Sequence, residues 1–394
     1  MKIIYTLFLL ALLKCIVQVY AQNETLHLLD ELNDPSMRVR LSALEIINKE
    51  NLTEYIPHLE ELYYAQSEPL MKYSFLFTLK ILGSENIISY CIDFINEADA
   101  FDQMFPPKDP LEMKVEATLL LLHSGYYETI NYVFELIERD STNITAVSLH
   151  SLELIADNVP ESRTEVKEYL NFFIANSNDD ILRSIALNIL ANQFGNESEE
   201  VLIMRSRSDP ELMVRLRCLK NLISIKYPEI KNLLYERLHA EPERSGRLYI
   251  ADTLLTAFGE PLDLQTVKTY SSIEPDIQMR PLFDYLVSSF KPHKPSIPTH
   301  EMIDSLNSYT DQLFQFSWIK NEEDYKHYKE KTKNLRELFE QNKTDELCSN
   351  LNWIISQAES HYGRDVLTKE GYKFLFYYTG YIKEKIETEF DCHN

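Results

Sequence analysis

One sequence pattern constrains the fold of this chain more than any other, because it occurs twice. "NDPSMRVRLSALEII" begins at Asn33, and "SDPELMVRLRCLKNL" begins at Ser208. Both read Asp-Pro, three residues, Val-Arg, two residues, and then a small residue followed by an apolar run. The position of the small residue recurs every 32 to 40 residues, at Ala43, Phe77, Ala117, Ser151, Ala186, Cys218, Ala251 and Phe283. Repeats of this length are typical of arrays of helical pairs.

Each copy also carries signals for the start and end of a helix. An acidic residue followed by proline opens the copies that begin at Asp34, Glu68, Asp109, Asp209 and Glu274. A carboxylate caps a helix, and proline fits the first turn because its missing N–H would be unpaired there. Glycine, which ends helices, follows the small position by six to nine residues at Gly83, Gly125, Gly195 and Gly259.

The segments between these helices are also helical in pattern. "YPEIKNLLYERLH" and "TEVKEYLNFFIAN" place apolar residues three and four positions apart. A single helical hairpin cannot bury both of its faces, and stacking against neighbouring hairpins supplies the core. The sequence therefore predicts an all-α protein, with an α-solenoid of about eight helical hairpins over residues 22–290.

The copies "DPSMRVRLSALEII" and "DPELMVRLRCLKNL" resemble HEAT repeats, and the resemblance covers roughly residues 24–290. The second copy departs from the family pattern, with Phe77 at the small position and Ser74 for Arg, and the eighth departs at Phe283. The resemblance implies an α-solenoid that binds other proteins and implies no chemistry. It also implies that the recurring Asp and Arg side chains cross-link neighbouring hairpins, as would Asp34, Arg40, Asp209 and Arg215.

A proline-rich segment ends the array. "SSFKPHKPSIPTH", residues 288–300, has three prolines within seven residues, which exclude a helix and favour a stiff extended linker over residues 291–299. Four helical segments follow in residues 300–394. Because a linker carries few contacts, we expect the array to fold without them.

This C-terminal region resembles the FIMAH domain, a small helical module of exported and surface bacterial proteins. The matching words are "FSWI", "LRELFEQNKTDELCSNLNWIISQAES" and "LTKEGYKFLFYYTGYIKEKI". Ser317 stands where glycine often precedes Trp-Ile, and Cys348 replaces a small residue. The resemblance implies a bacterial protein, so the five Asn-x-Ser/Thr sequons would be unused.

Residues 1–21 have the pattern of a signal peptide, with the apolar core "IIYTLFLLALL" and small residues before a cleavage site after Ala21. Lipid anchoring through Cys15 is the alternative, but Lys14 stands where a lipobox has a small residue. We expect a secreted or periplasmic protein without a membrane span. In an oxidising compartment Cys348 can pair with Cys392, whereas Cys91 and Cys218 lie in apolar runs as core residues.

The net charge is −23, from 39 basic and 62 acidic residues. Such a surface repels phosphate backbones and excludes nucleic acid as a partner. It favours a basic protein partner, although solubility alone also explains the charge. The sequence predicts no oligomeric state.

No motif for catalysis, a metal or another cofactor is present. "HEMID" at His300 lacks the second histidine of a zinc protease, and "NSNDD" at Asn176 lacks the glycine of a calcium loop. Helix capping explains Asp179 and Asp180 equally well. We therefore expect a non-enzymatic scaffold that binds a protein partner. The alternative is a HEAT-like enzyme or enzyme accessory of lyase or hydrolase type in the cell envelope.

The residues expected to contact the partner lie on the exposed face of the second helix of each hairpin. Aligning the copies gives Arg38, Ser42, Glu45, Ser148, Glu153, Ser184, Asn188, Arg217 and Lys220. Their mixed charges predict a polar, salt-sensitive interface. At each position an ordinary solvated surface is the alternative.

Overall fold

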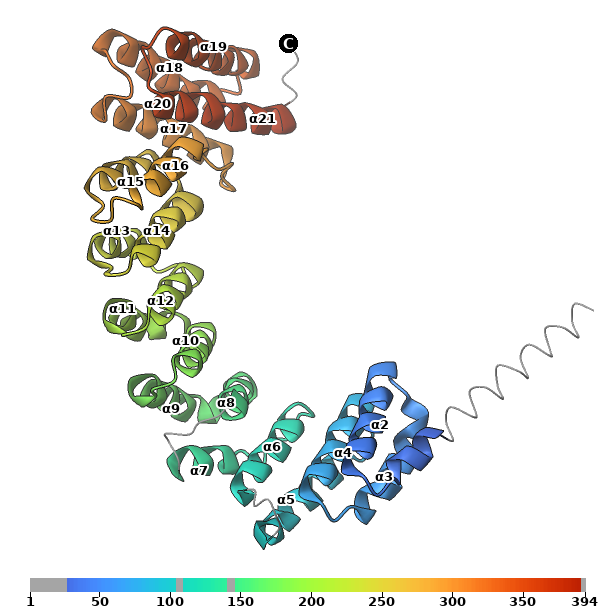
Figure 1. Cartoon of the computed structure of the whole chain (residues 1–394). Coiled ribbons are helices and arrows are strands. Elements are labelled where there is room, and N and C mark those ends of the chain that lie inside the picture. Colours follow the sequence, from blue (N-terminus) through green and yellow to red (C-terminus); the bar gives the residue numbers. More distant parts are fainter. Residues whose placement is uncertain (1–26, 104–108, 140–145, 391–394) are drawn as a thin grey trace, which may run out of the picture. The chain divides into compact units, whose positions relative to one another are not determined.

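The computed structural model describes residues 27–103, 109–139 and 146–390. Within these ranges the chain is helical, and the only β-type pairing is an isolated bridge between Ile319 and Leu367. The predicted all-α class is confirmed. The chain divides between Leu202 and Ile203 into two compact units, both of which are drawn in Figure 1.

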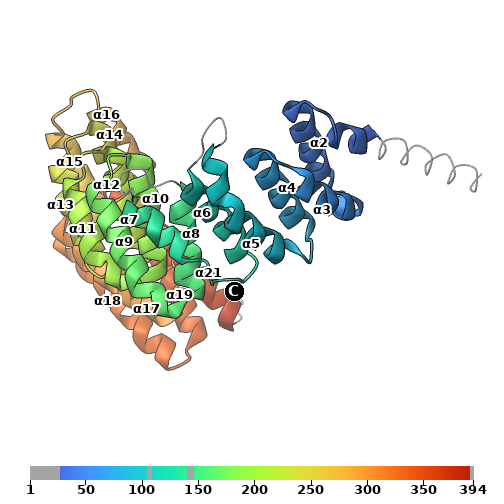
Figure 2. The same cartoon turned by 90° about the horizontal axis from the view of Figure 1, so that it is seen from below.

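Unit 1 alternates two sets of helices. The first set consists of α2 (Met37–Glu50), α4 (Pro69–Leu82), α6 (Pro110–Leu122), α8 (Ala146–Asn158) and α10 (Asp180–Phe194). The second set consists of α3 (Ile56–Ala65), α5 (Ile87–Glu97), α7 (Asn131–Arg139) and α9 (Arg163–Asn176). Successive even-numbered helices pack against one another, and each odd-numbered helix packs on its even-numbered neighbours (Figure 2). The hairpins in the middle of the unit are therefore packed against a neighbouring hairpin on both sides.

Unit 2 alternates two sets of helices in the same way, and the boundary between the units falls within α11 (Glu199–Ser208). The even-numbered helices are α12 (Leu212–Ser224), α14 (Arg244–Thr253) and α16 (Arg280–Ser289), and the odd-numbered ones are α13 (Ile230–Ala240) and α15 (Pro261–Ile273). A π-helical turn, Leu254–Phe258, extends α14. In Figure 1, α12, α14 and α16 form one layer of this unit, and α11, α13 and α15 form the other.

Four helical segments close unit 2, at the places predicted from the sequence. They are α17 (Thr299–Gln315), α18 (Glu322–Glu340), α19 (Thr344–Gly363), and α20 (Lys369–Lys373) joined to α21 (Thr379–Phe390) by a second π-helical turn, Phe374–Tyr378. α17 packs on α18, α18 on α19, and α21 on both α17 and α19. The result is a four-membered helical bundle.

The small position of the repeat is buried in seven of the eight copies. Ala43, Ala117, Ser151, Ala186, Cys218, Ala251 and Phe283 are each 0% exposed. The assignment of Phe77 is wrong, because its side chain is 46% exposed and Phe75 is buried instead. Lys72, 5% exposed, precedes Phe75 by three residues, as Arg40 precedes Ala43. The expected register of this copy was therefore shifted by two residues.

The proline-rich segment is non-helical between α16 and α17, as predicted, but the expectation that it carries few contacts is wrong. Lys373 of the bundle donates hydrogen bonds to the carbonyls of Val287 (3.2 Å) and Ser288 (2.9 Å) in α16. The Tyr381 hydroxyl donates to the carbonyl of Pro292 (3.1 Å), and the Phe290 and Phe374 rings lie 5.8 Å apart. These contacts join the bundle and the hairpins of unit 2 into one folding unit.

The cysteines follow the sequence-based expectation where the structure describes them. Cys91 and Cys218 are free thiols with 0% exposure, and Cys348 is disulfide-bonded. Cys392, the expected partner, lies outside the described residues, as do Cys15 and the predicted signal peptide.

Candidate functional site

A ladder of buried ion pairs fixes the orientation of the even-numbered helices in unit 2. Arg215 donates through Nη1 to the carbonyls of Asp209 (2.8 Å) and Pro210 (2.9 Å), and through Nε to Glu241 of the next hairpin (3.0 Å). Arg247 repeats this geometry with the carbonyls of Glu241 and Pro242 and with the carboxylate of Glu274, at 2.9 Å from Nε. Each arginine thus binds the start of its own hairpin and an acid of the next.

Burial and pairing oppose each other at these acids. Burial by itself would raise the pKa of Glu241, but hydrogen bonds from Arg215 and Arg237 and from the Glu243 amide lower it below its usual value. The pKa of Glu274 is lowered in the same way, against burial, by Arg247. Both acids therefore stay ionised, and these arginines have a structural role.

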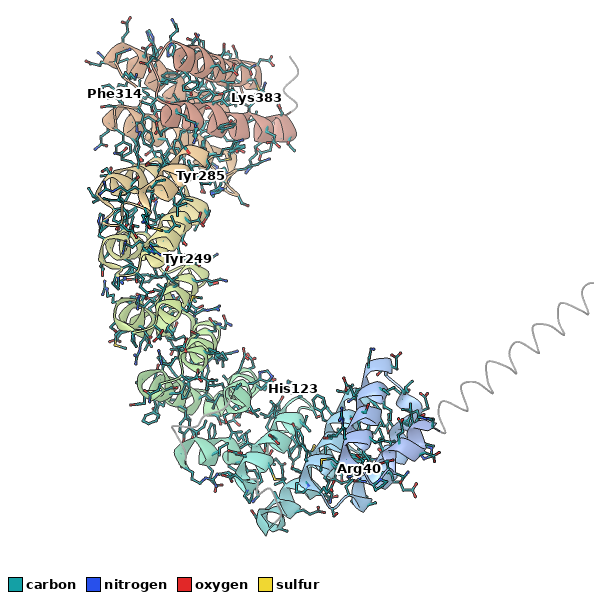
Figure 3. The ribbon with its side chains drawn as sticks, in the orientation of Figure 1. Arg40, His123, Tyr249, Tyr285, Phe314 and Lys383 are labelled. Carbon is teal, nitrogen blue, oxygen red and sulfur yellow. The ribbon has the colours of Figure 1, made fainter. Side chains whose placement is uncertain are left out.

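The ladder determines which side chains of α12, α14 and α16 point outward. Arg280 of α16 occupies the next ladder position and donates through Nε to the carbonyl of Glu274 (2.9 Å). The residues two positions after Arg215, Arg247 and Arg280 are Arg217, Tyr249 and Leu282, and those five positions after are Lys220, Asp252 and Tyr285. We call these six residues the repeat face. Tyr249 is 40% exposed, Leu282 45% and Tyr285 66%. In Figure 3, Tyr249 and Tyr285 lie on the layer of unit 2 formed by α14 and α16.

The repeat face combines exposed apolar groups with charges that form no ion pair in the described part of the chain. Arg217, Lys220 and Asp252 form no ion pair among the residues described. Exposed tyrosine offers a large, rigid contact surface with a polar hydroxyl, and such residues are frequent anchors in protein interfaces. The arrangement can bind a surface that supplies apolar side chains and carboxylates.

All but one of the residues predicted to contact a partner are at least partly exposed. Arg38, Ser42 and Glu45 are exposed on α2, and Lys220 is exposed on α12. The other predicted contacts that keep partial exposure are Glu153 on α8, Ser184 and Asn188 on α10, and Arg217 on α12.

The prediction for Ser148 is wrong, because its side chain is fully buried. Ser148 lies on the same face of α8 as Leu152 and Ile155, three to four residues apart, and both are buried.

Sequence reasoning missed the most exposed members of the repeat face. The signal was available, because adding 32 residues to Arg217 and Lys220 gives Tyr249 and Asp252, and adding 33 more gives Leu282 and Tyr285.

A cavity of about 380 Å³ lies where the end of α14, the proline-rich segment and the bundle meet. Its polar groups include Glu260, His293, Tyr309 and Tyr378, and residues of both π-helical turns line it. Burial, followed by the nearby Glu260 carboxylate, raises the pKa of Tyr309 above its usual value. The Tyr309 hydroxyl therefore stays protonated at neutral pH, while Glu260 binds Lys231 at 2.7 Å.

Membrane-spanning helices and metal-binding groups are two other kinds of functional element to consider in residues 27–103, 109–139 and 146–390. In those ranges no helix combines the length and apolar character needed to cross a bilayer. No group of three or more His, Cys, Asp or Glu side chains there is arranged to hold a metal ion. Asp179, one of the acids of the "NSNDD" segment, caps α10 by accepting from the Leu182 amide at 2.9 Å.

No protein-family model, characterised protein or solved structure matches this chain.

Proposed function

We propose that the protein is an exported, non-enzymatic scaffold of HEAT-like α-solenoid type that binds a protein partner through the repeat face. The observation that carries this proposal is the exposure of Tyr249 and Leu282, at equivalent positions of α14 and α16, and of Tyr285, three residues further along α16. Burying three such side chains at an interface would contribute several kcal/mol, at about 25 cal/mol per Å² of apolar surface. The C-terminal bundle, which is FIMAH-like in sequence, is proposed to stabilise the end of this array.

Three features support the HEAT-like assignment. Even- and odd-numbered helices alternate within each unit, the small position is buried, and arginines bind an acid of the following hairpin. Arg40 of unit 1 also follows this rule, because it donates to the carbonyl of Asp34 at 2.8 Å and to Glu68 at 2.5 Å. The cross-links expected from the family pattern therefore have counterparts in both units.

The charges of the repeat face define the kind of partner that fits it. Arg217 and Lys220 are cations beside the apolar side chains, and Asp252 is the single acid. A partner segment with apolar side chains flanked by carboxylates would complement this face. The net charge of −23 favours basic proteins at long range, so a partner with both signs would satisfy both conditions. In unit 1, Ser42 and Glu45 occupy the equivalent positions after Arg40, and they are proposed as contacts together with Arg38.

The alternative function, an enzyme or enzyme accessory of lyase or hydrolase type, is favoured by the cavity at the end of α14. Its groups are poorly suited to catalysis, however, because the Tyr309 pKa is raised and Glu260 is already bound by Lys231. A general base needs a pKa near the working pH and a free lone pair. The residues that line the cavity are better suited to packing the bundle against the hairpins of unit 2.

Affinity capture tests the scaffold proposal directly. The full chain, a variant with Tyr249→Ala, Leu282→Ala and Tyr285→Ala, and a control with Leu262→Ala and Ile273→Ala on α15 are used as baits on an envelope extract. The control residues are 44% and 55% exposed, within the range of the three repeat-face residues, so the control removes exposed apolar side chains outside the repeat face. We expect one protein to be captured by the full chain and the control but lost with the triple variant. Equal capture by all three baits would overturn the proposal.

A further inference from the structure

Two histidines that are 27 residues apart in sequence meet on the surface of unit 1. His123 is the C-cap residue of α6, and His150 lies in α8, which packs against α6. Their Nε2 atoms are 3.3 Å apart, and their ring centroids are 5.2 Å apart. Both side chains are exposed, so the pair is open to solvent (His123 is labelled in Figure 3).

From this geometry we propose that His123 and His150 bind one Zn²⁺ ion through their Nε2 atoms. Tetrahedral Zn²⁺ with Zn–N bonds of about 2.05 Å holds two ligand nitrogens about 3.3–3.4 Å apart. A square-planar ion with similar bonds would need about 2.9 Å. The observed separation of 3.3 Å matches the tetrahedral case. The same distance also suits a weak hydrogen bond between the two rings, which metal binding would replace.

The surroundings of the pair supply what a metal-binding imidazole requires. Nδ1 of His150 lies 3.3 Å from Oε2 of Glu153, which places a carboxylate behind the ligand. Such a carboxylate fixes the tautomer in which Nε2 carries the lone pair, and it makes the imidazole a better donor to the metal. His123 stands at the C-terminal end of α6, where the helix dipole favours a cation.

One nearby group opposes the ion. Lys80 donates through Nζ to the His123 carbonyl (3.2 Å) and to the Ser124 hydroxyl (2.8 Å), so its positive charge lies beside the pair. The negative charge of Glu153 offsets it. With two protein ligands, water completes the coordination, and we expect moderate affinity that responds to each of these charges.

Isothermal titration of the full chain, without a histidine tag, with Zn²⁺ alone tests the proposal. We expect one ion per chain, and at least tenfold weaker binding in both His123→Ala and His150→Ala. The control His58→Ala removes an exposed histidine of α3 and leaves the affinity unchanged. Glu153→Gln weakens binding about tenfold by removing the carboxylate behind His150. Lys80→Met strengthens it.

The absorption spectrum of bound Co²⁺ reports the geometry independently of affinity, and we expect the intense visible bands of tetrahedral coordination. These bands should be absent in the His123→Ala, His150→Ala double variant, whose helix content and unfolding transition are measured to confirm that it folds. Zn²⁺ binding that persists in the double variant, or no binding by the full chain, would overturn the proposal. Loss of partner capture by the repeat-face variant would leave it unaffected, because the two sites lie in different units.

Discussion

Arg215 and Glu241 form an ion pair in which both side chains are almost fully buried, at 5% and 1% exposure. Glu241 also accepts from Arg237, and its neighbour in the next step of the ladder, Arg247, donates to the Glu241 carbonyl. The pair therefore connects two hairpins of unit 2 and positions the outward side chains of α12 and α14.

Breaking this pair is predicted to destabilise unit 2 strongly. Arg215→Ala leaves the Glu241 carboxylate buried beside only one arginine, and we expect the free energy of unfolding to fall by about 3–5 kcal/mol. Urea denaturation followed by circular dichroism measures the change. The control is Arg207→Ala, because Arg207 and Glu236 form an ion pair with both side chains more than 40% exposed. That substitution should cost less than about 1 kcal/mol. Equal effects would show that burial does not determine the strength of the ladder.

Removing residues 300–394 is predicted to impair the folding of the hairpins that remain in unit 2. Truncation removes Lys373 from the carbonyls of Val287 and Ser288, and it exposes the buried ring of Phe290. We expect α14–α16 to lose cooperative unfolding, which hydrogen exchange would detect as faster exchange of their amides. If the amides of these helices exchange equally slowly in the truncated chain, the expectation drawn from the proline-rich sequence would hold instead, namely that the array folds without the bundle.

The two free thiols are predicted to be unreactive in the native protein. Burial raises the pKa of the Cys91 thiol to about 12 and raises that of Cys218 as well, so neither forms the reactive thiolate near neutral pH. A thiol reagent should label both only as fast as the protein unfolds. Fast labelling of Cys218 at pH 7, before any denaturant is added, would contradict its place at the small position of the repeat.

Lys373 is predicted to make the free energy of unfolding depend on pH in the alkaline range. Burial, together with the smaller effect of the positive charge of Lys369, lowers its pKa to about 8, whereas the unfolded side chain titrates near 10.5. Between pH 8 and 10 the unfolded state therefore binds more protons at Lys373 than the folded state. The contribution of Lys373 to the free energy of unfolding consequently increases with pH. Relative to Lys373→Met, the free energy of unfolding should rise by about 2 kcal/mol across this interval. A difference that is constant with pH would show that Lys373 stays charged.

Much of the fold follows from local signals in the sequence. The spacing from Arg215 to Cys218 places a buried cation and a buried small residue on one helix face, which periodicity alone reveals. The register around Phe77 and the burial of Ser148 could not be predicted as reliably, because these helices have apolar residues on more than one side. Which side faces a neighbour is decided by packing between hairpins.

The sites depend even more on tertiary contacts. His123 and His150 have no common spacing with the other histidines, and they meet only because α6 packs on α8. The contacts of the proline-rich segment likewise depend on where the bundle folds back. Proline excludes a helix there, but it does not determine whether the extended chain is exposed or packed.

Site-specific photo-crosslinking is the most direct test of whether the repeat face binds a protein. A photoreactive phenylalanine analogue is placed at Tyr285 on α16, and in a second sample at Thr269 on α15, both of which are exposed. After irradiation with the captured partner, we expect a crosslinked product from position 285 that disappears with Arg217→Glu and Lys220→Glu, and none from position 269. A crosslink from position 269 with none from position 285 would contradict it.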